Sequence, residues 1–217
     1  MKKKIPKPIT ETELKKIINA IINSKGNQFN KIRNSFMIYF AYKLGLRPKE
    51  TYNCELKHIN ITEKKLFIPG ENNKERQQDI IPLPDFLINN LKNYLKIRSL
   101  TFPENKYLFP TKSKRQRLDR SYQSKILRNA LKKADLYFIN FYDKIGRGKG
   151  NLTLYSLRHG FGTFIWKKTK DIKKTAIMLR HKDIMMRTTM IYIHLTEDEE
   201  RKEISNEIYK EKAQRFC

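Results

Sequence analysis

The chain has 217 residues, which is enough for one large or two small domains with a buried core. Its 47 lysine and arginine residues against 22 aspartate and glutamate residues give a formal charge of +25, which favours a polyanionic partner such as nucleic acid. A hydrophobic content of 39% with 11% aromatic residues argues against a disordered basic tail and predicts a folded domain.

Cysteine usage and hydropathy indicate the compartment. The two cysteines, Cys54 and Cys217, match neither a disulfide framework nor the spacing of a zinc site. We therefore expect a reducing compartment, the cytoplasm, and no metal or other cofactor. The basic N-terminus lacks the apolar segment of a signal peptide, and the chain has no run of about 18 apolar residues, so we expect no membrane span.

The first part of the chain has a helical pattern. Thr10 and Glu13 have the spacing of a capping box, and apolar residues follow at helical period. These apolar residues are Leu14, Ile17, Ile18, Ile21 and Ile22. A second helix is expected over residues 30–44, with Gly45 as its C-terminal stop.

A β region is expected after a short third helix, which Pro48 opens and which runs through Cys54. Three short strand candidates follow, at Ile59 with Ile61, at residues 66–68 and at residues 80–83. The polar run at residues 70–74 marks the turn between the last two strands.

The second half of the chain is again mostly helical in pattern. One helix starts at Pro84, and a basic connection at residues 112–120 leads to another that ends near Ala134. The first of these places one set of apolar residues on a single face: Phe86, Leu87, Leu91, Tyr94 and Leu95. Residues 146–150 are expected to form a flexible basic loop, without the ending of a phosphate-binding P-loop. From Tyr155 onward several helices are expected, so the predicted fold is mainly α with a small antiparallel β-sheet (α+β).

The distribution of charge divides the chain into a body, residues 1–196, and a C-terminal acidic helical tail, residues 197–217. The tail holds seven acidic and five basic residues, a net charge of −2, which leaves +27 for the body. A segment with this charge is not expected to touch DNA. Ile204 and Ile208 are four residues apart and would form a small apolar stripe on a helix.

Four short strings fall in a fixed order along the chain. The first is Gly45-Leu-Arg47-Pro-Lys-Glu50, and the second is Tyr155-Ser-Leu-Arg158-His159. Leu179-Arg-His181 and Thr189-Met-Ile-Tyr192 follow, with an interval of eleven residues between the histidine and the tyrosine. Two arginines, a histidine and a tyrosine are the groups needed to hold a phosphodiester and attack it.

These strings resemble those of the catalytic domain of the tyrosine recombinase (phage integrase) family, over residues 9–194. The sequence departs from the family pattern at Tyr155, where a histidine is usual, and before His181, where a glycine is usual. The resemblance implies that the body is a catalytic domain of this type. It also implies a separate helical DNA-clamping domain before the catalytic one, and no such domain is evident here, so we expect a minimal form, a truncated form or a fragment.

The resemblance also implies a role for each matched residue. Arg47 and Arg158 would give forked hydrogen bonds to the phosphate oxygens and so stabilise the charge that develops there, and His181 would donate a further one. Tyr192 would attack the phosphorus and become a 3′-phosphotyrosyl ester. Tyr155 would still hydrogen-bond the phosphate, although a tyrosine does not exchange a proton near neutral pH as a histidine does.

The acid that protonates the leaving 5′-oxygen is a lysine in a β-hairpin turn of the resembling family. Lys74 and Arg76 are both candidates, and Lys74 has the family spacing, eight residues before Pro82. Counting forward from Gly70 instead places Glu71 there, which is a poor acid at neutral pH. We choose Lys74. Glu50 would orient Arg158 or simply favour a helix start through the helix dipole. His159 and His194 are expected to be structural or hydrogen-bonding residues.

The sequence therefore predicts a site-specific recombinase or integrase of a mobile element that cleaves and rejoins double-stranded DNA, with a homotetramer expected on paired sites. One alternative is a catalytically weak DNA-binding or regulatory relative, favoured by Tyr155 and the missing clamp. Another is a relaxing enzyme similar to a type IB topoisomerase, which shares the chemistry.

Overall fold

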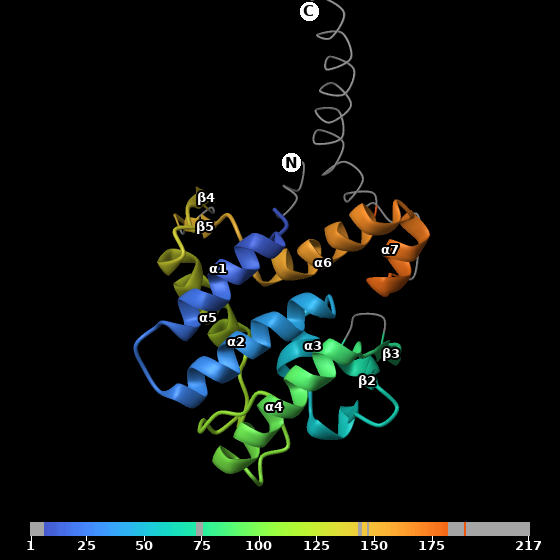
Figure 1. Cartoon of the computed structure of the whole chain (residues 1–217). Coiled ribbons are helices and arrows are strands. Elements are labelled where there is room, and N and C mark those ends of the chain that lie inside the picture. Colours follow the sequence, from blue (N-terminus) through green and yellow to red (C-terminus); the bar gives the residue numbers. More distant parts are fainter. Residues whose placement is uncertain (1–6, 73–75, 143–144, 147, 182–188, 190–217) are drawn as a thin grey trace, which may run out of the picture. The chain divides into compact units, whose positions relative to one another are not determined.

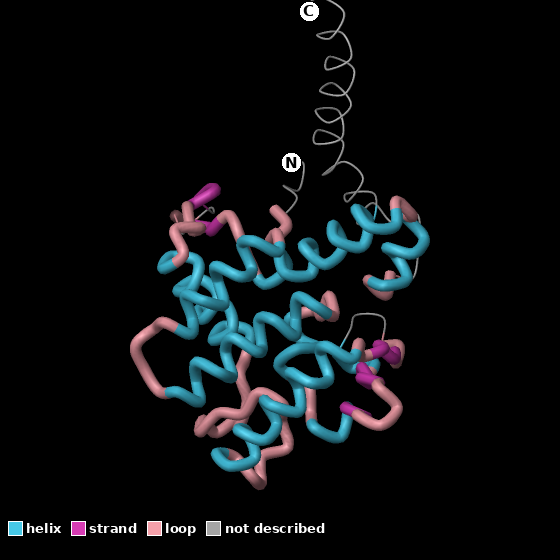
Figure 2. Tube along the Cα trace, viewed as in Figure 1, coloured by secondary structure: helices cyan, strands magenta, loops and turns pink. Residues whose placement is uncertain are grey.

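A computed structural model describes residues 7–72, 76–142, 145–146, 148–181 and 189 (Figure 1). The chain forms two compact units, residues 6–161 and residues 162–217 together with residues 1–5. As predicted, the described part is mainly helical with few strands, and Figure 2 shows the strands as small magenta segments among the cyan helices. None of the described helices combines the length and the apolar character that a membrane crossing needs.

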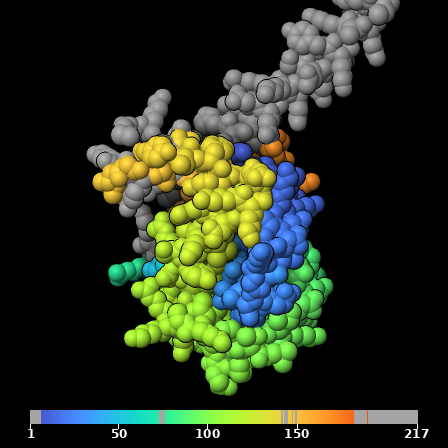
Figure 3. All heavy atoms as spheres, turned by 90° about the vertical axis from the view of Figure 1, so that its left-hand side faces the viewer, coloured from blue at the N-terminus to red at the C-terminus, as the bar shows by residue number. Residues whose placement is uncertain are grey.

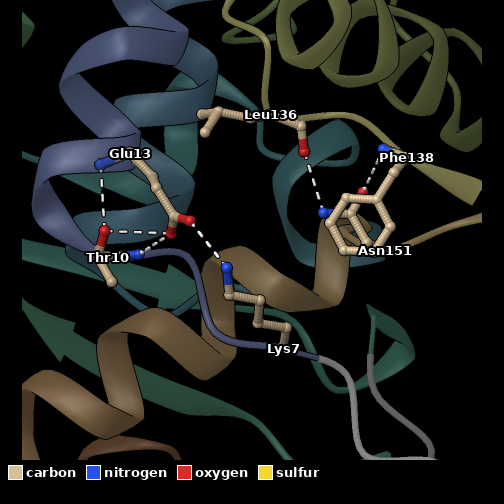
Figure 4. A network of polar contacts seen from close by, with 6 residues as sticks. All are labelled: Lys7, Thr10, Glu13, Leu136, Phe138 and Asn151. Atoms are coloured by element: carbon tan, nitrogen blue, oxygen red, sulfur yellow. Dashed lines mark hydrogen bonds and ion pairs between the residues drawn. The ribbon is translucent and has the colours of Figure 1, made fainter. Parts of the chain in front are cut away.

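The first helix, α1 (Glu11–Ile22), begins at the predicted capping box. The Thr10 hydroxyl oxygen accepts a hydrogen bond from the Glu13 amide at 3.1 Å, and a Glu13 carboxylate oxygen accepts one from the Thr10 amide at 2.8 Å (Figure 4). The same carboxylate pairs with Lys7 at 3.1 Å. These contacts satisfy amide groups that a helix start leaves without a partner, and they fix where the chain enters the domain.

Helix α2 (Gln28–Lys43) packs against α1 and against α4 (Asp85–Thr101), while α1 also packs against α5 (Arg120–Lys133). Figure 3 shows α1 in blue beside α5 in yellow-green. An aromatic cluster fills the space beneath α2, and its closest pair is Phe36 stacked on Tyr94, with ring centroids 4.6 Å apart. Aromatic side chains of this size supply a large share of the buried apolar area of a core.

The predicted face of α4 is wrong at one residue. Leu87, Leu91 and Tyr94 are buried as expected, but the Phe86 side chain is 50% exposed. Phe86 lies three and four residues before Asn89 and Asn90, which are also exposed, so it belongs to the solvent-facing side of the helix.

Three antiparallel strands form the predicted sheet in the order β1 (Ile59–Asn60), β2 (Lys65–Ile68), β3 (Asp79–Pro82). β2 and β3 are in register with Leu66 opposite Ile81, and both side chains are buried. Short 3-10 helices precede β1 (Leu56–His58) and follow β2 (Gly70–Asn72). The second of them begins the expected turn at residues 70–74, of which residues 73 and 74 lie outside the described part.

A second small sheet was not predicted. Strands β4 (Ile139–Tyr142) and β5 (Gly148–Gly150) pair antiparallel, so the expectation of a flexible loop at residues 146–150 is wrong for the last three of them. Asn151 closes the hairpin: its side-chain oxygen accepts from the Phe138 amide at 3.1 Å, and its side-chain nitrogen donates to the Leu136 carbonyl at 3.0 Å (Figure 4). The glycines of β5 lower the β propensity of this segment, so its sequence pattern did not predict a strand.

The remaining described helices are α3 (Pro48–Tyr52), α6 (Leu154–Thr169) and α7 (Ile172–Met178). Pro48 occupies the first turn of α3 as predicted, although the helix ends two residues before Cys54. The boundary between the two compact units falls inside α6, after Phe161. The predicted tail helix at residues 197–217 lies outside the described residues.

Candidate active site

Arg47 stands at the start of α3, where a carboxylate holds both its backbone and its side chain. One Glu50 carboxylate oxygen accepts from the Arg47 amide at 2.7 Å, and the other accepts from the Arg47 guanidinium at 2.8 Å. The Glu50 side chain is fully buried, whereas that of Arg47 is 22% exposed. Removing one partner of a buried ion pair typically costs about 3–5 kcal/mol, so this pair fixes Arg47 firmly. Glu50 lies at a helix start, which is one of the two roles that the sequence left open for it, and there it binds Arg47.

Arg158 reaches the same segment of the chain from α6. Its guanidinium nitrogen Nη1 donates to the Gly45 carbonyl oxygen at 2.7 Å, a contact between residues 113 positions apart. Arg158 is only 5% exposed. The structure therefore places the second arginine against the backbone two residues before the first one.

Position 45 requires a glycine for two reasons, its backbone conformation and a closely packed neighbouring side chain. Its φ of +57° lies in the left-handed region, and a Cβ atom there would come within 2.3 Å of the Phe161 ring. The Ile9 amide also donates to the Ser156 carbonyl on α6 at 3.0 Å. These close contacts fix the first part of α6 and the direction of Arg158. The Gly45 carbonyl was not predicted to contact Arg158, although Gly45 opens the first of the four strings.

Two further residues of the second string lie on α6. Tyr155, three residues before Arg158 and so on the same side of the helix, is 41% exposed. Burial, together with the adjacent Arg158 charge, lowers the pKa of His159 to about 4, so this imidazole is neutral at pH 7. The His159 side chain is half-buried, and its structural or hydrogen-bonding role stays a prediction.

His181 belongs to the other compact unit and follows α7. Its amide donates to the Ala176 carbonyl at 2.9 Å, and its Nδ1 lies 2.7 Å from the Thr189 hydroxyl oxygen. Thr189 is fully buried. The third and fourth strings are therefore joined by a hydrogen bond that fixes the imidazole ring. The contact of Thr189 with His181 was not predicted, although the fixed spacing of the two strings could have suggested it.

Arg180 stands directly before His181, at the position where the family pattern has a glycine. Its φ of +55° lies in the left-handed region, which glycine adopts without strain and other residues adopt at a cost. The chain keeps this conformation with an arginine in place of the glycine.

Three predicted residues lie outside the described part of the chain: Lys74, Tyr192 and His194. Arg76, the alternative to Lys74, is described and exposed.

The chain belongs to the phage integrase family, whose model matches residues 7–199. It is 28% identical over 199 residues to a tyrosine recombinase of Thermosipho africanus (strain TCF52B), covering 92% of this chain and 61% of the relative. It is 30% identical over 195 residues to the tyrosine recombinase XerA of Pyrococcus furiosus, covering 89% of this chain and 59% of the relative. The chain thus spans about three fifths of the length of these curated relatives.

Solved structures confirm the predicted fold class. The chain is similar to the XerH site-specific recombinase bound to palindromic difH substrate in a post-cleavage complex, with a TM-score of 0.71, 23% identity and coverage of 95% of this chain and 54% of that one. It is also similar to the XerA recombinase, with a TM-score of 0.68, 23% identity and coverage of 94% and 66%. The fold is that of a tyrosine recombinase catalytic domain.

Proposed function

We propose that this protein is a site-specific DNA recombinase that cleaves and rejoins double-stranded DNA through a 3′-phosphotyrosyl intermediate. The observation that carries the proposal is the contact of Arg158 with the Gly45 carbonyl, two residues from an Arg47 held by Glu50. Arg158 thus contacts the backbone beside Arg47, although the two residues are far apart in the sequence. The names of the relatives, which are tyrosine recombinases, support the same function.

The proposed role of the arginines follows from the charge of the transition state. Attack on a DNA phosphate builds negative charge on the non-bridging oxygens, and a guanidinium can donate two parallel hydrogen bonds to them. One N–H group of Arg158 already donates to the Gly45 carbonyl, so the direction of the guanidinium is fixed before DNA binds. A pre-oriented donor gives up little entropy or reorganisation energy when the charge appears.

Tyr192 is the proposed nucleophile and His181 a proposed donor to the same phosphate. The phenol has an ordinary pKa of about 10, so it must lose its proton as it attacks. Cleavage then forms the tyrosine–phosphorus bond and breaks the bond to the 5′-oxygen, so the ester keeps the energy needed for rejoining. The hydrogen bond between His181 and Thr189 supports this role, because it orients the imidazole.

Lys74 is the proposed acid for the departing 5′-oxygen, and Tyr155 a proposed hydrogen-bond donor to the phosphate. The exposure of Tyr155 on the side of α6 that also carries Arg158 supports its part. With both arginines, His181 and Tyr192 present, Tyr155 should tune the activity. This weighs against the catalytically weak relative, and the Thr-x-x-Tyr string fits a recombinase better than a type IB topoisomerase.

The proposed partners are double-stranded DNA and three further copies of the chain. The charge of +25 supports DNA binding, and several solved relatives are described as bound to DNA. We propose a homotetramer on paired sites in which the acidic tail, residues 197–217, docks on a neighbouring protomer. The cysteine content, including the buried thiol of Cys54, supports the further proposal of a cytoplasmic location.

The test uses a pool of nicked duplexes with a randomised core and one labelled strand. Cleavage beside the nick releases a short fragment, so rejoining fails and the covalent adduct accumulates. The proposal predicts a labelled protein band on a denaturing gel and a common sequence among the trapped duplexes. A band with no common sequence would favour the topoisomerase-like alternative, and DNA binding without any band would favour the inactive relative.

A further inference from the structure

Helix α4 exposes a row of uncharged side chains. The row consists of Phe86, Asn90, Asn93, Ile97 and Leu100, and all five side chains are exposed. Successive members are four and three residues apart, so they lie on one side of the helix over about four turns. Leu100 is 87% exposed and Phe86 is 50% exposed, so large apolar groups face water at both ends. We refer to this row as the α4 stripe.

The α4 stripe differs from the outer side of α5. On α5, Lys125, Arg128 and Lys132 are exposed at the same helical spacing. This cationic side suits phosphate groups, as expected in a chain with a formal charge of +25. The α4 stripe offers no charge to a phosphate, but its apolar side chains offer area to the surface of another protein.

The spacing of the α4 stripe is symmetric about Asn93. Phe86 lies seven residues before Asn93 and Leu100 lies seven residues after it, which is about 10 Å along the helix in each direction. In an antiparallel pair of α4 helices centred on Asn93, Phe86 therefore lies level with the partner's Leu100. Ile97 then lies between the partner's Phe86 and the partner's Asn90. The stripe is thus complementary to itself, as a two-fold contact requires.

The charge of the chain limits where two copies can touch. Two molecules with a formal charge of +25 repel each other, and burying an unpaired cation between them would add a further cost. The exposed Lys92 and Lys96 lie toward one edge of the α4 stripe, so the stripe itself allows contact without burying a charge. At its centre, each Asn93 amide can donate to and accept from the other. A central pair of this kind fixes the register of packed helices.

We propose that the α4 stripe is a self-association surface that pairs two copies of this chain in an antiparallel, two-fold contact. This inference goes beyond the proposed function, because it concerns the protein without DNA and does not involve the acidic tail. One pair of helices is small beside the roughly 1,600 Å² of a standard interface, so the contact is weak and reversible.

Salt should strengthen this association, whereas it weakens the binding of DNA. The repulsion between two copies is screened as the Debye length falls from about 10 Å at about 0.1 M salt to about 3 Å at about 1 M. The burial of Phe86, Ile97 and Leu100 is not weakened in this way. Sedimentation equilibrium of the full chain without DNA, over this range of salt, measures the dependence.

The decisive test is a charge swap at Asn93, measured in the same way at about 0.15 M salt. Asn93→Lys and Asn93→Glu each place two like charges together at the two-fold axis, so each should self-associate at least about tenfold more weakly than the wild type. An equimolar mixture brings a lysine beside a glutamate and should recover the wild-type affinity. Leu100→Ser should also weaken association about tenfold, because a symmetric pair loses two leucine contacts.

The matched controls are Ser99→Lys and Ser99→Glu. Ser99 is exposed on the same helix but six residues from Asn93, so it faces away from the α4 stripe. These variants have the same net charges as the Asn93 variants and should associate like the wild type. All of the substituted side chains are exposed, so the variants should fold, which thermal unfolding checks.

Weak association of each Asn93 variant with recovery in the mixture supports the inference, because a two-fold contact centred on Asn93 places this residue against itself. If the mixture is no tighter than either variant alone, or if the Asn93 variants associate like the wild type, the inference is overturned. A wild type that stays monomeric at every salt concentration overturns it too, and weaker DNA binding by Asn93→Glu than by Ser99→Glu would then assign the stripe to DNA. None of these outcomes depends on cleavage, so the proposed function stands or falls separately.

Discussion

The arginine part and the histidine part of the candidate site are built in different ways. Arg158 is held by a contact that spans 113 positions, and Arg47 depends on a fully buried carboxylate. His181, in contrast, is held by Ala176 and Thr189, within eight positions of it. The two arginines are therefore positioned by the packed fold, whereas the imidazole is positioned by residues close to it in the sequence.

This difference predicts two kinds of variant. Changes near the arginines should alter cleavage and folding stability together, because the same buried contacts serve both. Changes near His181 should alter cleavage with little effect on the unfolding of residues 6–161.

The largest expected effect is that of Arg158→Lys. A lysine lacks the planar fork that can hold the Gly45 carbonyl from one nitrogen and donate two parallel hydrogen bonds to a phosphate, so we expect cleavage to fall by about 10² or more, roughly 3 kcal/mol in the transition state. Single-turnover cleavage of a nicked duplex measures it. Arg128→Lys, on the exposed side of α5, is the matched control. Full activity of Arg158→Lys would contradict the account of the arginine part.

Acid should weaken the arginine part through His159. The folded protein keeps this imidazole neutral, with a pKa of about 4, whereas the unfolded chain titrates near 6.5. The unfolded chain therefore binds the extra proton between these values, and stability falls as pH falls through this window. Between pH 7 and pH 4.5 the loss should be about 2 kcal/mol.

Urea unfolding of the wild type and His159→Gln at both pH values measures this loss. Because His58 also has a lowered pKa and remains in both proteins, the difference between them isolates His159. An equal pH dependence in the two proteins would show that His159 contributes nothing to it.

The sequence predicted the parts of the fold that depend on local pattern. The capping box at Thr10 and the sheet at Leu66 and Ile81 were found because short-range spacing determines them. The four strings also point to Arg47 and Arg158, whose catalytic roles stay predictions. The Gly45 carbonyl could not be found in this way, since its contact with Arg158 exists only after the chain has folded.

In the histidine part, Thr189→Val should reduce cleavage moderately. Valine keeps the volume of the buried side chain but removes the hydroxyl that orients the His181 ring. A net hydrogen bond is worth about 1 kcal/mol, so we expect a loss of roughly fivefold. Thr189→Ser, which keeps the hydroxyl, should restore most of the rate. If serine and valine behave alike, the hydrogen bond does not contribute to cleavage.

The smallest expected effect is a gain of stability in Arg180→Gly. The left-handed conformation strains an arginine, and glycine relieves this strain at some entropic cost in the unfolded chain, so the net gain should be about 0.5 kcal/mol. Arg180→Ala removes the same side chain but keeps the strain, so the difference between the two variants in thermal unfolding isolates the backbone. A glycine variant no more stable than the alanine variant would refute the strain.

The most direct test of the central claim is to identify the residue that carries the DNA. The wild type and Tyr192→Phe are incubated with the trapped nicked duplex, digested with protease and analysed by mass spectrometry, with DNA binding measured in parallel. The account predicts a 3′-phosphate ester on the peptide that contains Tyr192, and DNA binding without any adduct in the phenylalanine variant. An adduct at the normal rate in Tyr192→Phe, or an ester on another residue, would contradict it.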